Sequence, residues 1–163
     1  MTSDENRIEG GHPPLSGWQP MVCEILVEDI AASLAFWRDL VGFHIAYDRK
    51  AEKFAYLERL LPDRRGAQVM LAERNGRWET GPMVSPFGRG VMFQICVEDL
   101  APILAALDTA GWPLHSPLRD IWRETGDHET GQREVFVLDP DGYLLMLYQD
   151  LGDRPLKTAR QLV

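Results

Sequence analysis

Hydrophobic residues follow two recurring patterns along this chain: short continuous apolar runs, and longer segments in which apolar residues have helical spacing. The first apolar run covers residues 21–27 and is typical of a buried strand. Asp29 follows as a residue that can cap a helix, and Gly42 ends the helical pattern, since glycine readily adopts positive φ. Three strand-like runs come next, at residues 43–48, 53–58 and 67–73. This half of the chain therefore predicts one βαβββ module.

The second half repeats the same order of elements. Val27-Glu28-Asp29-Ile30-Ala31 recurs as Val97-Glu98-Asp99-Leu100-Ala101, an offset of 99 − 29 = 70 residues. Gly111 ends the second helical pattern as Gly42 ends the first. The strands expected in this copy are residues 91–97, 113–116, 134–138 and 143–149, with a polar loop at residues 118–132. A repeat of this length indicates two copies of one structural unit.

We therefore expect an α+β fold in which two βαβββ modules form a cup-shaped mixed β-sheet with helices outside. The modules cover residues 20–74 and 90–150, joined by a linker at residues 75–89. Residues 1–19 lack periodicity and predict a flexible N-terminal arm whose end is pinned by Trp18. Residues 151–163 are expected to form a C-terminal tail, either a short helix or frayed.

Composition narrows the class of protein. The chain has 163 residues, of which 45% are hydrophobic and 26% charged, as in an ordinary globular domain. Its net charge of −8 argues against nucleic-acid binding, and no apolar run is long enough to span a membrane. Without a recognisable secretory or transit segment, we expect a cytoplasmic protein. Cys23 and Cys96 lie in strand-like runs and are expected to be reduced thiols.

Several short motifs stand in a characteristic order along the chain. They are Val27-Glu28-Asp29, Ser33-Leu34-Ala35-Phe36-Trp37, Leu40-Val41-Gly42-Phe43, Phe87-Gly88-Arg89-Gly90 and Phe136-Val137-Leu138-Asp139-Pro140-Asp141-Gly142. This order resembles the vicinal oxygen chelate superfamily, which includes glyoxalases, extradiol dioxygenases, fosfomycin-resistance enzymes and bleomycin-resistance proteins. The resemblance extends from Val22 to Gln149.

Metal-dependent members of this superfamily hold their ion with ligands from the first and last strand of each module. The resemblance places these four positions at Val22, Met70, Met92 and Met146. Hard and borderline divalent ions require imidazole, carboxylate or other oxygen donors, which these side chains do not offer. We therefore expect no metal and no cofactor. Thioethers can bind Cu(I), but methionine as adaptable apolar filler of a pocket is the preferred interpretation.

The resemblance is closest to the metal-free bleomycin-resistance proteins, through Leu118-Arg119-Asp120-Ile121-Trp122 and the strand that follows Arg133. It implies a homodimer that performs no reaction and sequesters a cationic aromatic antibiotic. Aromatic stacking and carboxylates suit such a ligand. The implied ligand-binding residues are Tyr47, Phe54, Met70, Met92, Trp122, Met146 and Val22, with Trp78 as a further candidate. The carboxylates available to attract the cation are Asp48, Glu52, Glu58, Asp120 and Glu124.

Two alternatives remain open at this point. The chain could be a lyase, isomerase or dioxygenase that uses a displaced metal or a histidine base, with His44 and His128 as the candidates and His115 the remaining histidine of the domain. It could also be a protein whose cup is filled by its own side chains.

Overall fold

The computed structural model describes residues 11–156. The first module contains strand β1 (Cys23–Val27), helix α1 (Ile30–Leu34), a π-helical segment (Ala35–Leu40), β2 (His44–Arg49), a short 3-10 turn (Lys50–Glu52), β3 (Phe54–Leu60) and β4 (Gly66–Glu73). Its four strands form one mixed sheet in the order β1-β4-β3-β2, called sheet A below. Strand β1 is parallel to β4, and the other pairs are antiparallel.

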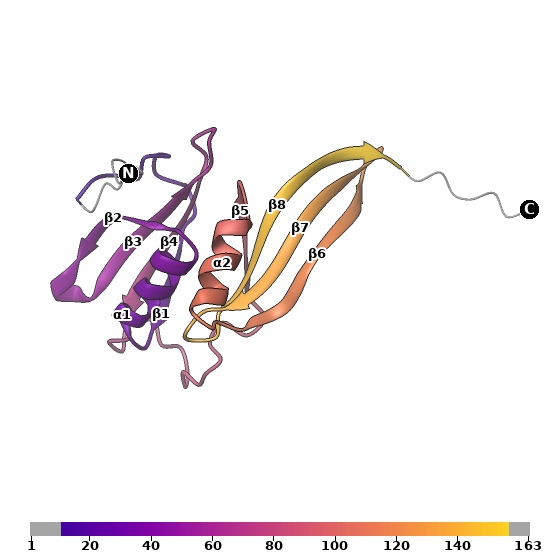
Figure 1. Ribbon diagram of the computed structural model, residues 1–163. Helices are drawn as coiled ribbons and strands as arrows, with labels where there is room; N and C mark the ends of the chain where they lie inside the picture. The colour runs from indigo at the N-terminus through magenta and orange to yellow at the C-terminus, as the bar shows by residue number, and fades with distance from the viewer. Residues whose placement is uncertain (1–10, 157–163) are drawn as a thin grey trace, which may run out of the picture.

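The second module repeats this topology. It contains β5 (Met92–Val97), α2 (Ala101–Thr109), β6 (Leu114–Thr125), β7 (His128–Leu138) and β8 (Leu144–Pro155). Its sheet, called sheet B, has the order β5-β8-β7-β6, with β5 parallel to β8. The predicted α+β fold of two βαβββ modules is confirmed. In Figure 1 sheet A lies on the left and sheet B on the right, with α1 and α2 between them in this view.

The local signals that begin and end the helices act as expected. The Asp29 carboxylate accepts hydrogen bonds from the backbone N–H groups of Ala31 and Ala32, at 2.8 and 3.2 Å, which satisfies two donors at the start of α1. The Asp99 carboxylate accepts one from Ala101 at 2.9 Å. Gly42 has a φ of +85°, a conformation that strains any residue with a Cβ atom.

The predicted polar loop at residues 118–132 is wrong. This segment belongs to β6 and β7, which pair from Arg119 opposite Glu134 to Thr125 opposite His128. The exposed ribbon carries polar side chains on both faces, so it lacks the alternation of apolar and polar residues by which strands are recognised. Strand β8 likewise runs to Pro155, into the segment expected to be a tail, and residues 157–163 lie outside the described residues.

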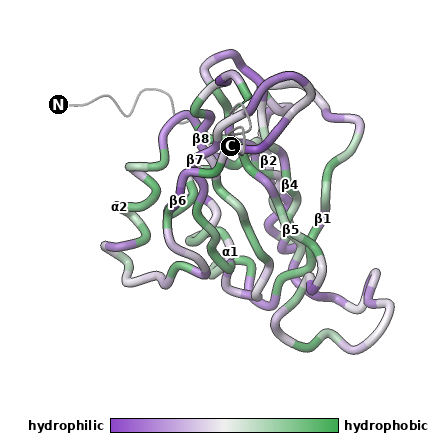
Figure 2. Tube along the Cα trace, turned by 90° about the vertical axis from the view of Figure 1, so that its right-hand side faces the viewer, coloured by the Kyte–Doolittle hydropathy of each residue, from purple (hydrophilic) through white to green (hydrophobic). Residues whose placement is uncertain are grey.

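One hydrophobic core joins the two modules. Trp37 is fully buried and its ring lies 6.2 Å from that of Phe93, while the Phe36 and Trp112 rings are 5.0 Å apart. The Trp37 indole N–H also donates to Asp139 at 3.1 Å. In Figure 2 hydrophobic residues follow α1 and β1, whereas α2 alternates between hydrophobic and hydrophilic positions, as expected for a helix with one buried face.

No helix within residues 11–156 is long and apolar enough to cross a membrane.

Candidate functional site

The face of sheet A that points away from the helices carries a cluster of its own, which we call the aromatic face. Successive residues of a strand point to opposite faces, so Ala55 and Leu57 pack into the shared core while Phe54 and Tyr56 point to the other side. The aromatic face is formed by Val22, Leu26, Ala46, Tyr47, Phe54, Tyr56, Met70, Ala72 and Met83. The structure thus brings together four of the predicted ligand-binding residues, namely Val22, Tyr47, Phe54 and Met70.

Three aromatic rings form a row on this face, and the N-terminal arm adds a fourth. The Tyr47 and Tyr56 rings are stacked, with centroids 5.1 Å apart, and Phe54 lies 5.9 Å from Tyr47. Trp18 meets both tyrosines edge-on, at 6.0 and 5.6 Å, while 62% of its surface stays exposed. The expectation that Trp18 pins the end of the arm agrees with these contacts, and residues 1–10 lie outside the described residues.

A planar cation already occupies one ring of the row. The Arg49 guanidinium lies 3.8 Å from the centroid of the Phe54 ring, and its Nε donates to Glu52 at 2.9 Å. Such stacking is the favourable geometry between a planar cation and the electron-rich face of an aromatic ring.

A polar row crosses the end of the aromatic face, in register over β2, β3 and β4. It consists of His44, Glu58 and Gln68. The fully buried Glu58 carboxylate lies 3.2 Å from His44 Nε2 and accepts from the backbone N–H groups of Leu15 and Ser16, both at 2.8 Å, and from the Ser16 hydroxyl. Burial alone would raise the Glu58 pKa, but the hydrogen bonds from Ser16 and Leu15 and the neighbouring His44 outweigh it and hold that pKa below its usual range.

A groove of 530 Å³ opens beside β1, where the two modules meet. It is lined by Cys23, Glu24, Ile25, Leu26, Trp78, Met83, Gly88, Val91, Phe93 and Tyr143. Leu26 and Met83 belong to the aromatic face as well, so the groove continues that surface. Burial raises the pKa of Glu24 more than the nearby Arg77 and Arg49 lower it. Trp78, a candidate from its place in the linker, does line this groove.

The remaining predicted ligand-binding residues lie on sheet B, away from the aromatic face. Met146 is buried on the face opposite to the shared core, and Met92 is 43% exposed. Trp122 pairs with Gly131, and strand alternation from Gly131 to Val135 places it on the core side of the sheet, opposite to Met146. Its ring covers Gly131 and lies under the Arg154 guanidinium, 4.0 Å from the ring centroid.

The donor set does not fit the divalent metal of the superfamily. Within the described residues, no three His, Cys, Asp or Glu side chains lie close enough together to hold an ion. Met70 pairs with Glu24 and Tyr56, and Met146 with Gln94 and Phe136, so neither methionine has an imidazole beside it in the ladder. Cys23 and Cys96 are free thiols.

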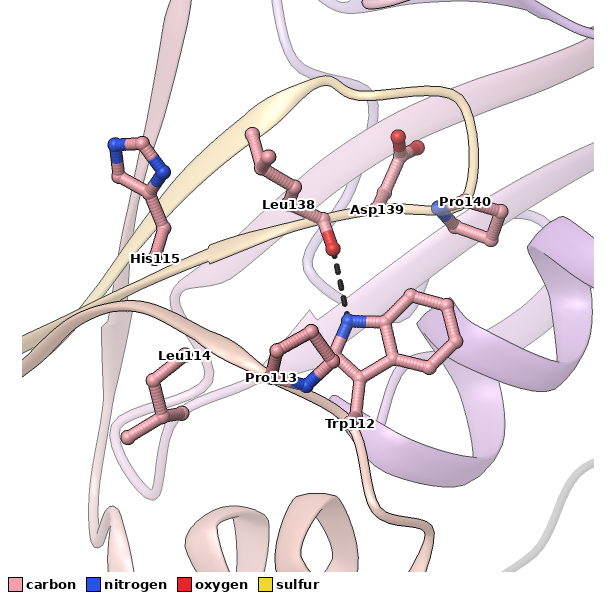
Figure 3. A pocket seen from close by; sticks show the side chains of 7 residues that line it. All are labelled: Trp112, Pro113, Leu114, His115, Leu138, Asp139 and Pro140. Atoms are coloured by element: carbon pink, nitrogen blue, oxygen red, sulfur yellow. Dashed lines mark hydrogen bonds between the residues drawn. The ribbon is translucent and has the colours of Figure 1, made fainter.

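His128 and His115 do not belong to the aromatic face. His128, at the tip of the β6–β7 hairpin, has its Nδ1 2.8 Å from Asp127, and the hydrogen bond to that residue raises the His128 pKa. His115 lines a second cavity, of 510 Å³, together with Trp112, Pro113, Leu114, Leu138, Asp139 and Pro140. Figure 3 shows this cavity and the hydrogen bond from the Trp112 indole to the Leu138 carbonyl oxygen.

Sequence reasoning missed Tyr56, Glu24 and the role of Glu58 at this site. One usable signal existed, because Tyr56 and Glu58 follow Phe54 at intervals of two within one strand and so share its face. The contact of residues 15–18 with the sheet had no comparable signal.

The chain was compared with protein families, with curated protein sequences and with solved structures. The family model for the glyoxalase/bleomycin resistance protein/dioxygenase superfamily matches residues 20–147. A solved member of that superfamily from Vibrio splendidus is 30% identical over 78% of this chain and 95% of its own, with a TM-score of 0.34. None of the curated protein sequences matches the chain significantly.

Two further solved structures share the fold at low sequence identity. A protein of unknown function from Agrobacterium tumefaciens has a TM-score of 0.60 at 22% identity, over 83% of this chain and 96% of its own. A lactoylglutathione lyase from the same organism has a TM-score of 0.50 at 15% identity, over 80% of this chain and 92% of its own.

Proposed function

The chain belongs to the glyoxalase/bleomycin resistance protein/dioxygenase superfamily, and we propose that it is a metal-free, homodimeric protein that binds a flat, cationic aromatic molecule of the bleomycin type. The observation that carries this proposal is the row of Tyr47, Tyr56 and Phe54 on the aromatic face. It lies beside the positions where metal-dependent relatives would need ligands, which Val22 and Met70 occupy here.

The chain's own groups on this face support the chemistry of the ligand. Arg49 stacks on Phe54 as a planar cation, and Trp18 meets Tyr47 as an aromatic ring. A ligand that is both cationic and aromatic could make the same two kinds of contact with these rings. Glu24 in the adjoining groove and the net charge of −8 favour a cation over an anion.

The proposed dimer is supported by apolar side chains exposed on and around sheet B. Exposed large hydrophobic residues there are Val91, Met92, Leu114 and Leu118. Val91 and Met92 lie at β5, and Leu114 and Leu118 lie on β6, the two edge strands of sheet B. A second copy of the chain that packs against one of these edges would cover its apolar side chains. Sedimentation velocity is the measurement: a species of twice the chain mass is expected, and a monomer at high concentration would contradict this part of the proposal.

Isothermal titration with bleomycin, and with ethidium as a simpler planar aromatic cation, tests the binding. We expect saturable binding that Tyr47→Ala weakens. Tyr148→Ala, on sheet B, is the matched control and should leave the affinity unchanged. Absence of binding by every cationic aromatic compound would remove the resistance-type function.

A second candidate function is an enzyme of the lyase, isomerase or dioxygenase class. The observation in its favour is the pairing of His44 Nε2 with the Glu58 carboxylate at 3.2 Å, because a carboxylate can orient a histidine that acts as a general base. Stoichiometric Zn, Ni, Mn or Fe in freshly purified protein would select this candidate over the metal-free one.

A further inference from the structure

We propose that residues 15–18 are an internal competitor for the ligand: they occupy the aromatic face with groups that imitate it, and binding requires their displacement. This inference rests on the proposed function. It also assigns the row of His44, Glu58 and Gln68 as the end of the ligand site that recognises N–H and O–H donors.

The contact of Trp18 supports displacement rather than a permanent structural role. Its ring meets Tyr47 and Tyr56 edge-on, and 62% of its surface remains in solvent. A side chain that belongs to a folded core is buried far more completely, as Trp37 is. Trp18 therefore contacts the rings of the aromatic face, but it buries only a small part of its own surface there.

The contacts of Ser16 define the donor-recognising end. Three donors reach one carboxylate: the Leu15 N–H, the Ser16 N–H and the Ser16 hydroxyl all donate to Glu58. The Gln68 amide donates to the Ser16 hydroxyl at 2.8 Å and to the Gly17 carbonyl at 2.6 Å. A cationic ligand with amine or amide N–H groups can replace these donors, since the Glu58 carboxylate accepts charge-assisted hydrogen bonds.

The backbone of β4 lies so close to the arm that one methyl group would interfere with docking. A Cβ atom at Gly66 would lie 2.5 Å from Ser16 Oγ, 2.9 Å from Ser16 Cβ and 3.0 Å from Glu58 Oε1. No positive φ constrains Gly66, so Gly66→Ala acts through these contacts, and the two shortest are with the arm. Gly81→Ala is a matched control, because a Cβ atom there meets nothing within 4 Å and Gly81 has no positive φ either.

The experiment titrates ethidium into the full-length protein and its variants. Trp18→Ala and Gly66→Ala should each raise the affinity about three- to tenfold, the size expected from losing an aromatic contact in the competing state. Gly81→Ala should leave it unchanged. A lower affinity in Trp18→Ala would overturn the proposal, because Trp18 would then be part of the ligand site.

Amide hydrogen exchange measured by NMR follows the arm directly. Without ligand, the Leu15 and Ser16 amides should be protected, and Glu58→Gln should reduce their protection. Saturating ethidium should abolish protection in the unsubstituted chain, and protection that persists would overturn the competition. No binding to any variant would overturn the proposed function. Equal affinities in all variants would overturn the competitor role alone.

Discussion

The two sheets differ most where their strand registers are equivalent. In sheet A, Phe54 pairs with Arg49 of β2, and the Arg49 guanidinium lies over the Phe54 ring. In sheet B, Glu134 holds the corresponding place, pairs with Arg119 of β6 and binds the Arg119 guanidinium at 2.9 Å. The two arginines thus have different cross-strand partners, the Phe54 ring in one module and the Glu134 carboxylate in the other, although Arg119 also lies 5.6 Å from the centroid of the Phe136 ring.

Two methionines establish this equivalence. Met70 pairs with Glu24 on one side and Tyr56 on the other. Met146 stands between Gln94 and Phe136 in the same way. One strand further across each sheet, the partners differ: Tyr47 of β2 lies opposite Tyr56, whereas Ser116 of β6 lies opposite Phe136.

The difference teaches that the two modules share their core face and diverge on the other. Where sheet A has the Phe54 ring, sheet B has the buried Glu134 carboxylate, which Arg119 and Arg123 neutralise. A carboxylate engaged by two guanidinium groups attracts an external cation weakly. This difference favours sheet A over sheet B for the cation binding that we propose.

The largest expected effect is on the free energy of unfolding, and it compares a buried ring on the aromatic face of sheet A with its partly buried equivalent on sheet B. Tyr56→Ala should lower the free energy of unfolding by about 3 kcal/mol or more, because it removes a buried ring and the hydrogen bond from its hydroxyl to Gln68. Phe136→Ala, at the equivalent position of sheet B, should cost less because Phe136 is only partly buried. Urea unfolding measures both, and equal costs would contradict the difference between the faces.

A second expected effect concerns Asp139, which connects the modules through Trp37. Burial raises the pKa of Asp139 to about 6 from 3.8, despite hydrogen bonds from Tyr143, Trp37 and Asp141. Between about pH 4 and about pH 6 the folded protein therefore holds a proton that the unfolded chain releases. The free energy of unfolding should fall by about 3 kcal/mol as pH rises through this window, since each pKa unit corresponds to about 1.4 kcal/mol.

Asp139→Asn tests the origin of that fall. Urea unfolding of both proteins at about pH 4 and about pH 7 should show a smaller pH-dependent loss in the variant. The variant should also be less stable at the lower pH, because an amide N–H₂ cannot accept the hydrogen bond that the Trp37 indole donates. The same pH dependence in both proteins would assign it to other groups.

The smallest expected effects compare the two equivalent arginines. Arg119→Gln should cost about 1–2 kcal/mol, because the buried Glu134 keeps Arg123 as a partner and Arg119 is itself half exposed. Arg49→Gln removes only a cation–π contact and a surface ion pair, and should cost no more than about 1 kcal/mol. Thermal unfolding can rank the two variants, and a larger loss for Arg49→Gln would reverse the comparison.

Much of the fold could be predicted because its signals are local. The repeat of the Val-Glu-Asp motif, the caps at Asp29 and Asp99 and the glycine at Gly42 each act within a few residues of themselves. The β6–β7 ribbon was mistaken for a loop for the opposite reason. Its strands are stabilised by pairs between distant polar residues, such as Arg133 with Asp120, and not by an apolar face.

About half of the candidate site could be predicted as well. Tyr47, Phe54, Val22 and Met70, the positions that the superfamily resemblance implied, lie together on the aromatic face. Trp122 lies on the core side of sheet B, opposite to Met146. No periodicity in the sequence indicated the strand that contains Trp122. Its face could therefore not be predicted, because a shift of one residue in register reverses the face of a side chain.

The sequence by itself determined two modules and their order, and the superfamily resemblance identified the side chains at four equivalent strand positions. Only the tertiary structure decided which distant segments meet on the aromatic face. Leu15 and Glu58 are 43 residues apart, and nothing near either one indicates that the Leu15 N–H meets the Glu58 carboxylate. Contacts over such separations depend on where the strands bring the chain in space, whereas caps, turns and repeats depend on neighbouring residues alone.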